Sequence, residues 1–189
     1  MIGHGRYFLT DLYGTAIARA TGLLGPHLLT ATDDFGPAAR TAIATRLTNP
    51  EVHNLLAYAA GLTRTAPSAA WLRTARPLLT PPADQVVTII LDCFTGTHFP
   101  IGSRNDELVR GLTWLLPDTR TDLVARVALA AATSENNNGY LNASRTAAAA
   151  VTILAARPGP LADQTLTHLS RTVRNKPLRK RVAAALGIV

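Results

Sequence analysis

The sequence predicts an all-α fold, and its composition, residue spacing and helix-start signals are the observations that indicate it. Apolar residues make up 47% of the 189 residues, whereas aromatic residues contribute only 5%. An interior filled mainly by alanine, leucine, valine and isoleucine favours closely packed helices over a sheet sandwich. Valine and isoleucine are scattered among alanines, without the sustained apolar and polar alternation that is typical of a strand.

Apolar residues at helical spacing, interrupted by proline, glycine and asparagine, predict about ten short helices. Short polar side chains precede many of them, because these side chains accept hydrogen bonds from the free amides of a first turn. The expected capping residues are Asp33, Asp34, Asn49, Ser68, Asn105, Asn142 and Asn175. The expected helices cover residues 8–24, 37–47, 50–62, 69–79, 81–94, 106–116, 118 or 121–132, 143–156, 161–173 and 176–186.

Two segments lack helical periodicity and are expected to be exposed loops. Residues 95–104 contain two glycines and a proline, and residues 134–139 are polar and end in glycine. Within the fourth expected helix, Pro77 should cause a kink or an early end, because its ring is incompatible with a helix interior.

Short helices joined by tight turns cannot bury their apolar faces without neighbours, which is the logic of an α-solenoid of stacked antiparallel helix pairs. We therefore expect a single helical repeat domain over residues 1–189, with a basic C-terminal helix at 176–186. The repeat period is irregular and no consensus recurs cleanly. A compact multi-helix bundle is the alternative.

Cysteine usage and hydropathy limit the class of protein. Cys93 is the single cysteine, so no intramolecular disulfide or multi-cysteine metal site can form. The first residues lack the apolar stretch of a secretion signal, and no run of eighteen apolar residues occurs. These patterns predict a cytoplasmic protein with no membrane partner.

Positive charge is concentrated at the C-terminal end. Residues 1–163 contain 13 basic and 12 acidic residues, whereas residues 164–189 contain six basic residues and no acidic one, out of a net charge of +7. Such a cluster is a candidate polyanion-binding site, and a solvated terminal face is the commoner explanation. Aromatic residues are not interleaved with the cluster. The six candidates are Arg171, Arg174, Lys176, Arg179, Lys180 and Arg181.

Several segments occur in an order that resembles a known family. The most specific is Asn105-Asp-Glu-Leu-Val-Arg110-Gly111-Leu-Thr-Trp114. The others are Ser68-Ala-Ala-Trp71-Leu72, an alanine-rich segment after Asn142, and Val173-Arg-Asn-Lys176-Pro-Leu178-Arg-Lys180.

This order is similar to the HEAT-like helical region of large bacterial proteins of the MolR-like, Trp-Gly-Arg-domain group, over about residues 52–186. The resemblance implies a HEAT-like α-solenoid that serves as a platform, with no catalytic residues, in a group of largely undefined role. The sequence departs from the pattern in the three asparagines before the Asn142 segment and in lacking the long C-terminal domain. A stand-alone repeat module or a fragment is therefore expected.

Candidates for chemistry are few. Cys93, His98 and Asp106 have the residue types of a nucleophile, a base and an orienting carboxylate, but a thiol in an apolar helix is usually a small buried hydrophobe. The five histidines lie far apart, so a metal site is not expected. Trp71 and Trp114 fall on apolar helix faces and are expected to pack in the core. We therefore expect no catalytic, cofactor-binding or metal-binding residues.

Arg110 lies between apolar positions and could cap or bridge an adjacent helix or contact a partner; a solvated or structurally paired arginine is the commoner explanation. Three functions follow from these observations. The first is a non-catalytic scaffold that binds another protein or a peptide. The second is a nucleic-acid-binding HEAT-like protein that uses the basic end, and the third is an enzyme or enzyme subunit whose site cannot be identified from sequence.

Overall fold

A computed structural model of the chain describes residues 28–96, 100–133 and 143–188, and every regular element in these ranges is a helix. The all-α prediction is therefore confirmed for the described part of the chain. The expected helix at 8–24, the loop at 134–139 and the cap Asn142 lie outside the described residues. None of the described helices is long and apolar enough to cross a lipid bilayer.

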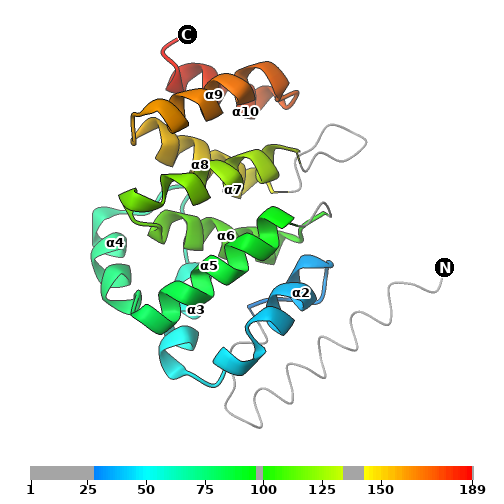
Figure 1. Cartoon of the computed structure of the whole chain (residues 1–189), viewed down its shortest axis with the longest axis vertical. Coiled ribbons are helices and arrows are strands. Elements are labelled where there is room, and N and C mark those ends of the chain that lie inside the picture. Colours follow the sequence, from blue (N-terminus) through cyan, green and yellow to red (C-terminus); the bar gives the residue numbers. More distant parts are fainter. Residues whose placement is uncertain (1–27, 97–99, 134–142, 189) are drawn as a thin grey trace, which may run out of the picture.

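The helices are short and follow one another closely (Figure 1). Three single turns of 3-10 helix join them at Ala44–Arg46, Arg76–Leu78 and Asp118–Arg120. The α-helices are α2 (Phe35–Ala42), α3 (Pro50–Ala60), α4 (Ala69–Ala75), α5 (Pro81–Gly96), α6 (Ser103–Leu115), α7 (Thr121–Thr133), α8 (Ser144–Ala155), α9 (Pro160–Thr172) and α10 (Lys176–Ala185).

Most expected helix starts are confirmed by capping hydrogen bonds. The Asn49 side chain accepts from the amide of Glu51 at 2.8 Å, and Ser68 caps α4. Asn175 accepts from the amide of Leu178 at 3.1 Å. Ahead of α2 the two expected caps differ. Asp33 accepts from the amide of Gly36 at 2.8 Å, whereas Asp34 makes no capping hydrogen bond.

The start of α6 was predicted wrongly. The helix begins at Ser103, so Asn105 lies inside its first turn and Gly102 precedes the helix. The Asn105 side chain makes hydrogen bonds with the backbone of Thr30, 75 residues away in sequence, and does not cap α6. The expected loop at 95–104 is also shorter, because α5 continues to Gly96. Pro77 ends α4 early, as predicted, in the 3-10 turn Arg76–Leu78.

The helices pack in two rows. In one row, α2, α5, α7 and α9 each contact the next member, and in the other row α3, α6, α8 and α10 do the same. The rows face each other through contacts of α5 with α6, α7 with α8, and α9 with α10. Figure 1 shows this succession from α2 and α3 at the bottom to α9 and α10 at the top. Segments far apart in sequence thereby become neighbours within each row.

One apolar core runs along the two rows, from Leu29 to Val182. Each fully buried leucine contributes about 1.5–3 kcal/mol to stability relative to an exposed one. The contact between α7 and α8 is lined largely by alanines and valines, which let the two helix backbones approach closely. The low aromatic content therefore suits the packing of thin, closely spaced helices.

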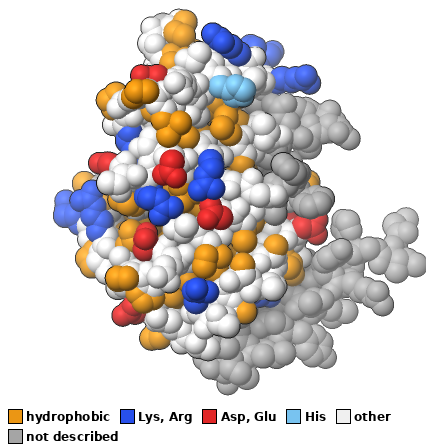
Figure 2. All heavy atoms as spheres, viewed as in Figure 1, with side chains coloured by type: hydrophobic (Ala, Val, Ile, Leu, Met, Phe, Trp, Pro, Cys, Tyr) orange, Lys and Arg blue, Asp and Glu red, His pale blue; other side chains and the backbone are white. Residues whose placement is uncertain are grey.

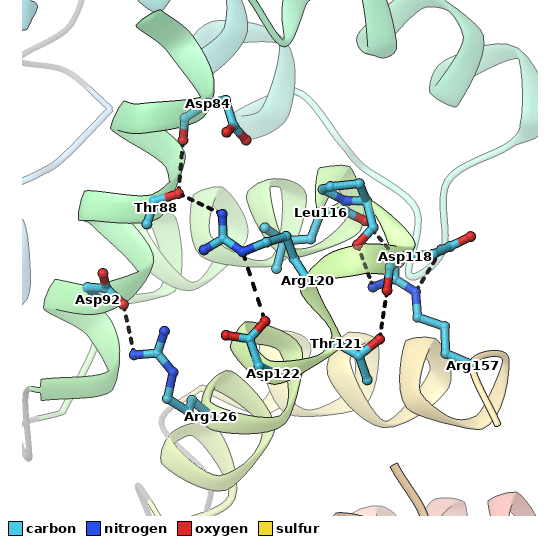
Figure 3. Close-up of polar contacts among 11 residues, drawn as sticks. Asp84, Thr88, Asp92, Leu116, Asp118, Arg120, Thr121, Asp122, Arg126 and Arg157 are labelled. Carbon is cyan, nitrogen blue, oxygen red and sulfur yellow. Dashed lines mark hydrogen bonds and ion pairs between the residues drawn. The ribbon is translucent and has the colours of Figure 1, made fainter. Parts of the chain in front are cut away.

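Ion pairs and hydrogen bonds reinforce contacts along the rows at the surface (Figure 3). Arg126 of α7 pairs with Asp92 of α5 at 2.8 Å, and Arg120 donates to the Thr88 hydroxyl at 3.3 Å. These groups are about half exposed or partly exposed, so each contributes little, about 0–1 kcal/mol. The stability of the stack therefore comes mainly from apolar burial.

Gly111 allows α3 and α6 to approach each other closely. A Cβ atom built at this position would lie 2.1 Å from the carbonyl oxygen of Ala59 in α3, far inside van der Waals contact. Glycine is usually unfavourable in a helix interior, so its presence here is explained by this approach. The distance between α3 and α6 is set by the missing side chain.

Replacing Gly111 by alanine should destabilise the protein, although alanine is the better helix former. We expect the free energy of unfolding to fall by about 1–3 kcal/mol, because the added methyl group forces α3 and α6 apart. Chemical denaturation monitored by circular dichroism measures the change. Gly96→Ala is the matched control, because a Cβ there meets nothing within 4 Å. Equal effects of the two substitutions would contradict this explanation.

Candidate anion-binding site

Asn105 of α6 holds the first described segment of the chain against the helix. Its carbonyl oxygen accepts from the amide of Thr30 at 3.0 Å, and its amide group donates to the carbonyl oxygen of Thr30 at 3.1 Å. The same amide group lies 2.9 Å from both carboxylate oxygens of Asp33. Asn105 is fully buried, so these hydrogen bonds form away from water. They fix the start of the described chain to α6.

Asp106, the next residue, caps the N-terminus of α8 from a different helix. Its carboxylate accepts from the amides of Arg145 and Thr146 at 3.1 and 3.0 Å, and from the Thr146 hydroxyl at 2.6 Å. Burial raises the pKa of the Asp106 carboxyl, and the hydrogen bonds from Thr146 and Arg145 partly oppose that rise. The Asp106 side chain therefore caps α8, and the sequence did not predict this role.

Arg110 bridges α6 to the end of α3. Only 3% of this residue is exposed, and its Nη2 donates to the carbonyl oxygen of Leu62, just beyond the C-terminus of α3. Arg40 and Arg157 act alike, donating to the carbonyl oxygens of Leu29 and Leu116. The bridging role considered for Arg110 is therefore present. Burial lowers the pKa of Arg110, and the nearby charge of Arg145 lowers it further.

Arg110 also lines a small cavity with two other arginines. The cavity has a volume of about 80 Å³ and lies where the loop after α3 meets α6, α8 and α10. Arg145 comes from the first turn of α8 and Arg181 from α10. We name this cavity the arginine pocket. It is lined by Thr65, Ala66, Arg110, Arg145, Ala148, Thr152 and Arg181.

The donors of the arginine pocket are only partly occupied. Arg145 pairs with Glu107 at 2.7 Å, and Arg181 donates to the Thr152 hydroxyl at 3.3 Å. The Nε of Arg110 is buried and has no hydrogen-bond partner among the described residues. Residues Arg110, Arg145 and Arg181 thus bring three guanidinium groups to the lining of one cavity. Such an arrangement suits an anion.

The six predicted polyanion-binding residues are all exposed, but the structure does not bring them into one site. Arg181 lines the arginine pocket, whereas the other five do not. Lys176, Arg179 and Lys180 are spaced to share one face of α10, opposite the buried Leu178 and Val182. Figure 2 shows basic side chains gathered at the end where α9 and α10 lie. We name Arg171, Arg174, Lys176, Arg179 and Lys180 the basic face.

No acidic side chain pairs with the basic face among the described ion pairs. All five side chains are exposed in the described structure. Arg174 also lines a cavity of about 140 Å³ with Thr172, Val173 and the end of α7. Of the basic face, Arg174 is the residue that lines this cavity.

Of the residues considered for thiol catalysis, the structure describes Cys93 and Asp106. Burial raises the pKa of the Cys93 thiol, and the charge of Asp92 raises it further, so the reactive thiolate is disfavoured. Asp106 is bound to α8, and His98 lies outside the described residues. Within the described ranges, no group of three His, Cys, Asp or Glu side chains could hold a metal ion.

The tryptophans and the buried histidine belong to the packing. Trp71 stacks on Tyr58 with ring centroids 5.0 Å apart, and Trp114 packs against the core. His53 is buried, and its Nε2 contacts the carbonyl oxygen of Leu47. Both tryptophans are partly buried, so they pack at the edge of the core and not inside it as expected. His168 is exposed on α9.

Replacing Asp106 by alanine should destabilise the protein strongly. The substitution leaves two α8 amides without their acceptor, while the Thr146 hydroxyl keeps only the backbone carbonyl oxygen of residue 106, so the free energy of unfolding should fall by about 2–4 kcal/mol. Glu107→Ala is the matched control, since it removes only an exposed ion pair and should cost under about 1 kcal/mol. Urea titration of both variants measures the difference. A loss at Asp106 no larger than at Glu107 would refute the capping role.

Comparisons of the chain with protein family models, with curated proteins and with solved structures find no match. The resemblance of the α6 segment to the MolR-like group stays a prediction. In this structure the residues of that segment connect α6 to its neighbours. A functional proposal therefore depends on the basic face and the arginine pocket alone.

Proposed function

We propose that this chain is a non-catalytic helical-repeat scaffold that binds a partner protein carrying an acidic segment. The single observation that supports it is the basic face: five exposed basic residues at one end of the helical stack, with no described acidic partner. Unpaired charge at a surface raises the rate of encounter with an oppositely charged partner. The proposed function is the binding of a partner, without catalysis.

The two rows of helices support the architectural part of the proposal. Each row adds one helix at a time, and each helix contacts the next in its row and its neighbour in the facing row. This is the contact pattern expected of a HEAT-like α-solenoid. A stack of this kind offers extended surfaces along its length. Helix α10 carries most of the basic face.

A peptide is favoured over nucleic acid by the composition of the basic face. Residues 164–189 contain no phenylalanine, tyrosine or tryptophan, so bases would find no aromatic platform to stack on. Nucleic acid binding stays the second candidate, because Lys176, Arg179 and Lys180 could contact phosphates along one helix face. Such binding would involve only the sugar-phosphate backbone of the nucleic acid and would not depend on its base sequence.

Fluorescence anisotropy with labelled poly-glutamate, duplex DNA and single-stranded DNA tests the proposal. We expect poly-glutamate to bind, and we expect its affinity to fall steeply as the sodium chloride concentration rises. The triple variant Arg174→Glu, Arg179→Glu, Lys180→Glu should weaken binding by about tenfold or more, because it reverses the charge of the basic face.

The control is Arg46→Glu, Arg73→Glu, Arg76→Glu, which changes the net charge equally at exposed positions in the first part of the described chain. It should bind nearly as tightly as the parent protein. Much tighter binding of either DNA would favour the second candidate. Failure of poly-glutamate to bind, or equal losses in the two triple variants, would exclude the basic face as the partner site.

A further inference from the structure

We propose that the arginine pocket is a binding site for a single phosphate group. This inference goes beyond the scaffold proposal and does not depend on it, because the basic face lies outside the pocket. The observation is the meeting of Arg110, Arg145 and Arg181, from three successive helices of one row, around a cavity of about 80 Å³. The phosphate could be inorganic phosphate or the phosphate of a modified side chain.

The size of the pocket selects a small ligand. A volume of about 80 Å³ lies well below the roughly 300–1,000 Å³ of pockets that enclose drug-sized ligands. An ion of a few heavy atoms fits this space, whereas a whole nucleotide or a larger metabolite does not. The exposed Thr65 and Ala66 form one wall, so the pocket is reached from the surface. A phosphate on a longer molecule could therefore enter with the rest remaining outside.

The charge balance selects an anion. Three guanidinium groups line the pocket, and the acidic groups nearby are already engaged. Glu107 pairs with Arg145 at 2.7 Å, and the Asp106 carboxylate receives the first amides of α8. Two carboxylates against three arginines leave a net positive charge. Like charges brought together are unfavourable by themselves, and a bound anion would relieve that repulsion.

Arg110 is the residue of the arginine pocket that the fold holds in a fixed position. It is 97% buried, its Nη2 is held by the carbonyl oxygen of Leu62, and its Nε has no partner among the described residues. The guanidinium is therefore fixed in place by the fold before any ligand arrives. Preorganised donors of this kind bind phosphate well, because little entropy is lost.

Arg145 and Arg181 complete the donor set from the surface. The Arg145 side chain is 45% exposed, and Arg181 is exposed and contacts Thr152 only through a 3.3 Å hydrogen bond. Both can reorient toward an anion at low cost. Neither is needed to hold a helix in place, unlike Arg110, so both can be changed without unfolding the protein.

Thermal unfolding in sodium phosphate, compared with sodium chloride at equal ionic strength, tests the proposal. A ligand that binds only the folded state raises Tm with concentration, so phosphate should raise Tm above the chloride control. Isothermal titration calorimetry with phosphate gives the affinity. Arg145→Gln and Arg181→Gln should each weaken that affinity by about tenfold or more, as expected for the loss of a charged hydrogen bond.

Arg179→Gln is the matched control, because Arg179 lies on the same helix as Arg181 but does not line the pocket. It should leave the phosphate affinity unchanged. A phosphoserine peptide that binds more tightly than inorganic phosphate would identify a modified side chain as the source, and the reverse order would identify the free ion. Both results support a phosphate site.

Three results would overturn the assignment. Phosphate could fail to raise Tm beyond chloride, or Arg179→Gln could lose as much affinity as Arg181→Gln, which would indicate general charge screening. An aspartate peptide could bind as tightly as the phosphoserine peptide, which would make the pocket a carboxylate site. The basic-face triple variant should bind phosphate normally, so failure here is distinguishable from failure of the scaffold proposal.

Discussion

The stack depends on the buried polar side chains of α6, which join helices that are far apart in sequence. Asn105 fixes Thr30, Asp106 caps α8, and Arg110 satisfies the carbonyl oxygen of Leu62 after α3. Apolar burial supplies most of the stability, but it is not directional and tolerates sliding between helices. Buried hydrogen bonds do not tolerate sliding, because a displaced donor or acceptor would be left unpaired. They therefore define how α3, α6 and α8 align.

Most of the fold could be predicted because helix caps and helical periodicity depend on residues that are close together in the sequence. Asn49, Ser68 and Asn175 cap helices as expected, because a cap and its amide lie two or three residues apart. Asn105 was assigned to a cap for the same reason, and this was wrong. Its partner Thr30 lies 75 residues away, and no local pattern reveals that distance. The same holds for Asp106, whose partners Arg145 and Thr146 lie 39 and 40 residues away.

The candidate functional residues differ in the same way, because one group is local in sequence and the other is formed by the packing of helices. The basic face was visible in the sequence, since its members lie within ten residues of one another and no acid interrupts them. The arginine pocket was not visible, because Arg110, Arg145 and Arg181 come from three helices that only stacking brings together. The one available signal was a single arginine between apolar positions in α6. Its partners could not be named without the packing of α6, α8 and α10.

Native-state hydrogen exchange at the amides of Thr30 and Thr146 tests the central role of α6 most directly. Both amides donate to α6 side chains, to Asn105 at 3.0 Å and to Asp106 at 3.0 Å. If these bonds define the alignment of the stack, both amides should exchange only through opening as costly as global unfolding, like those in the middle of α6. Rapid exchange of Thr30 and Thr146 by local fraying, while α6 stays protected, would contradict the account.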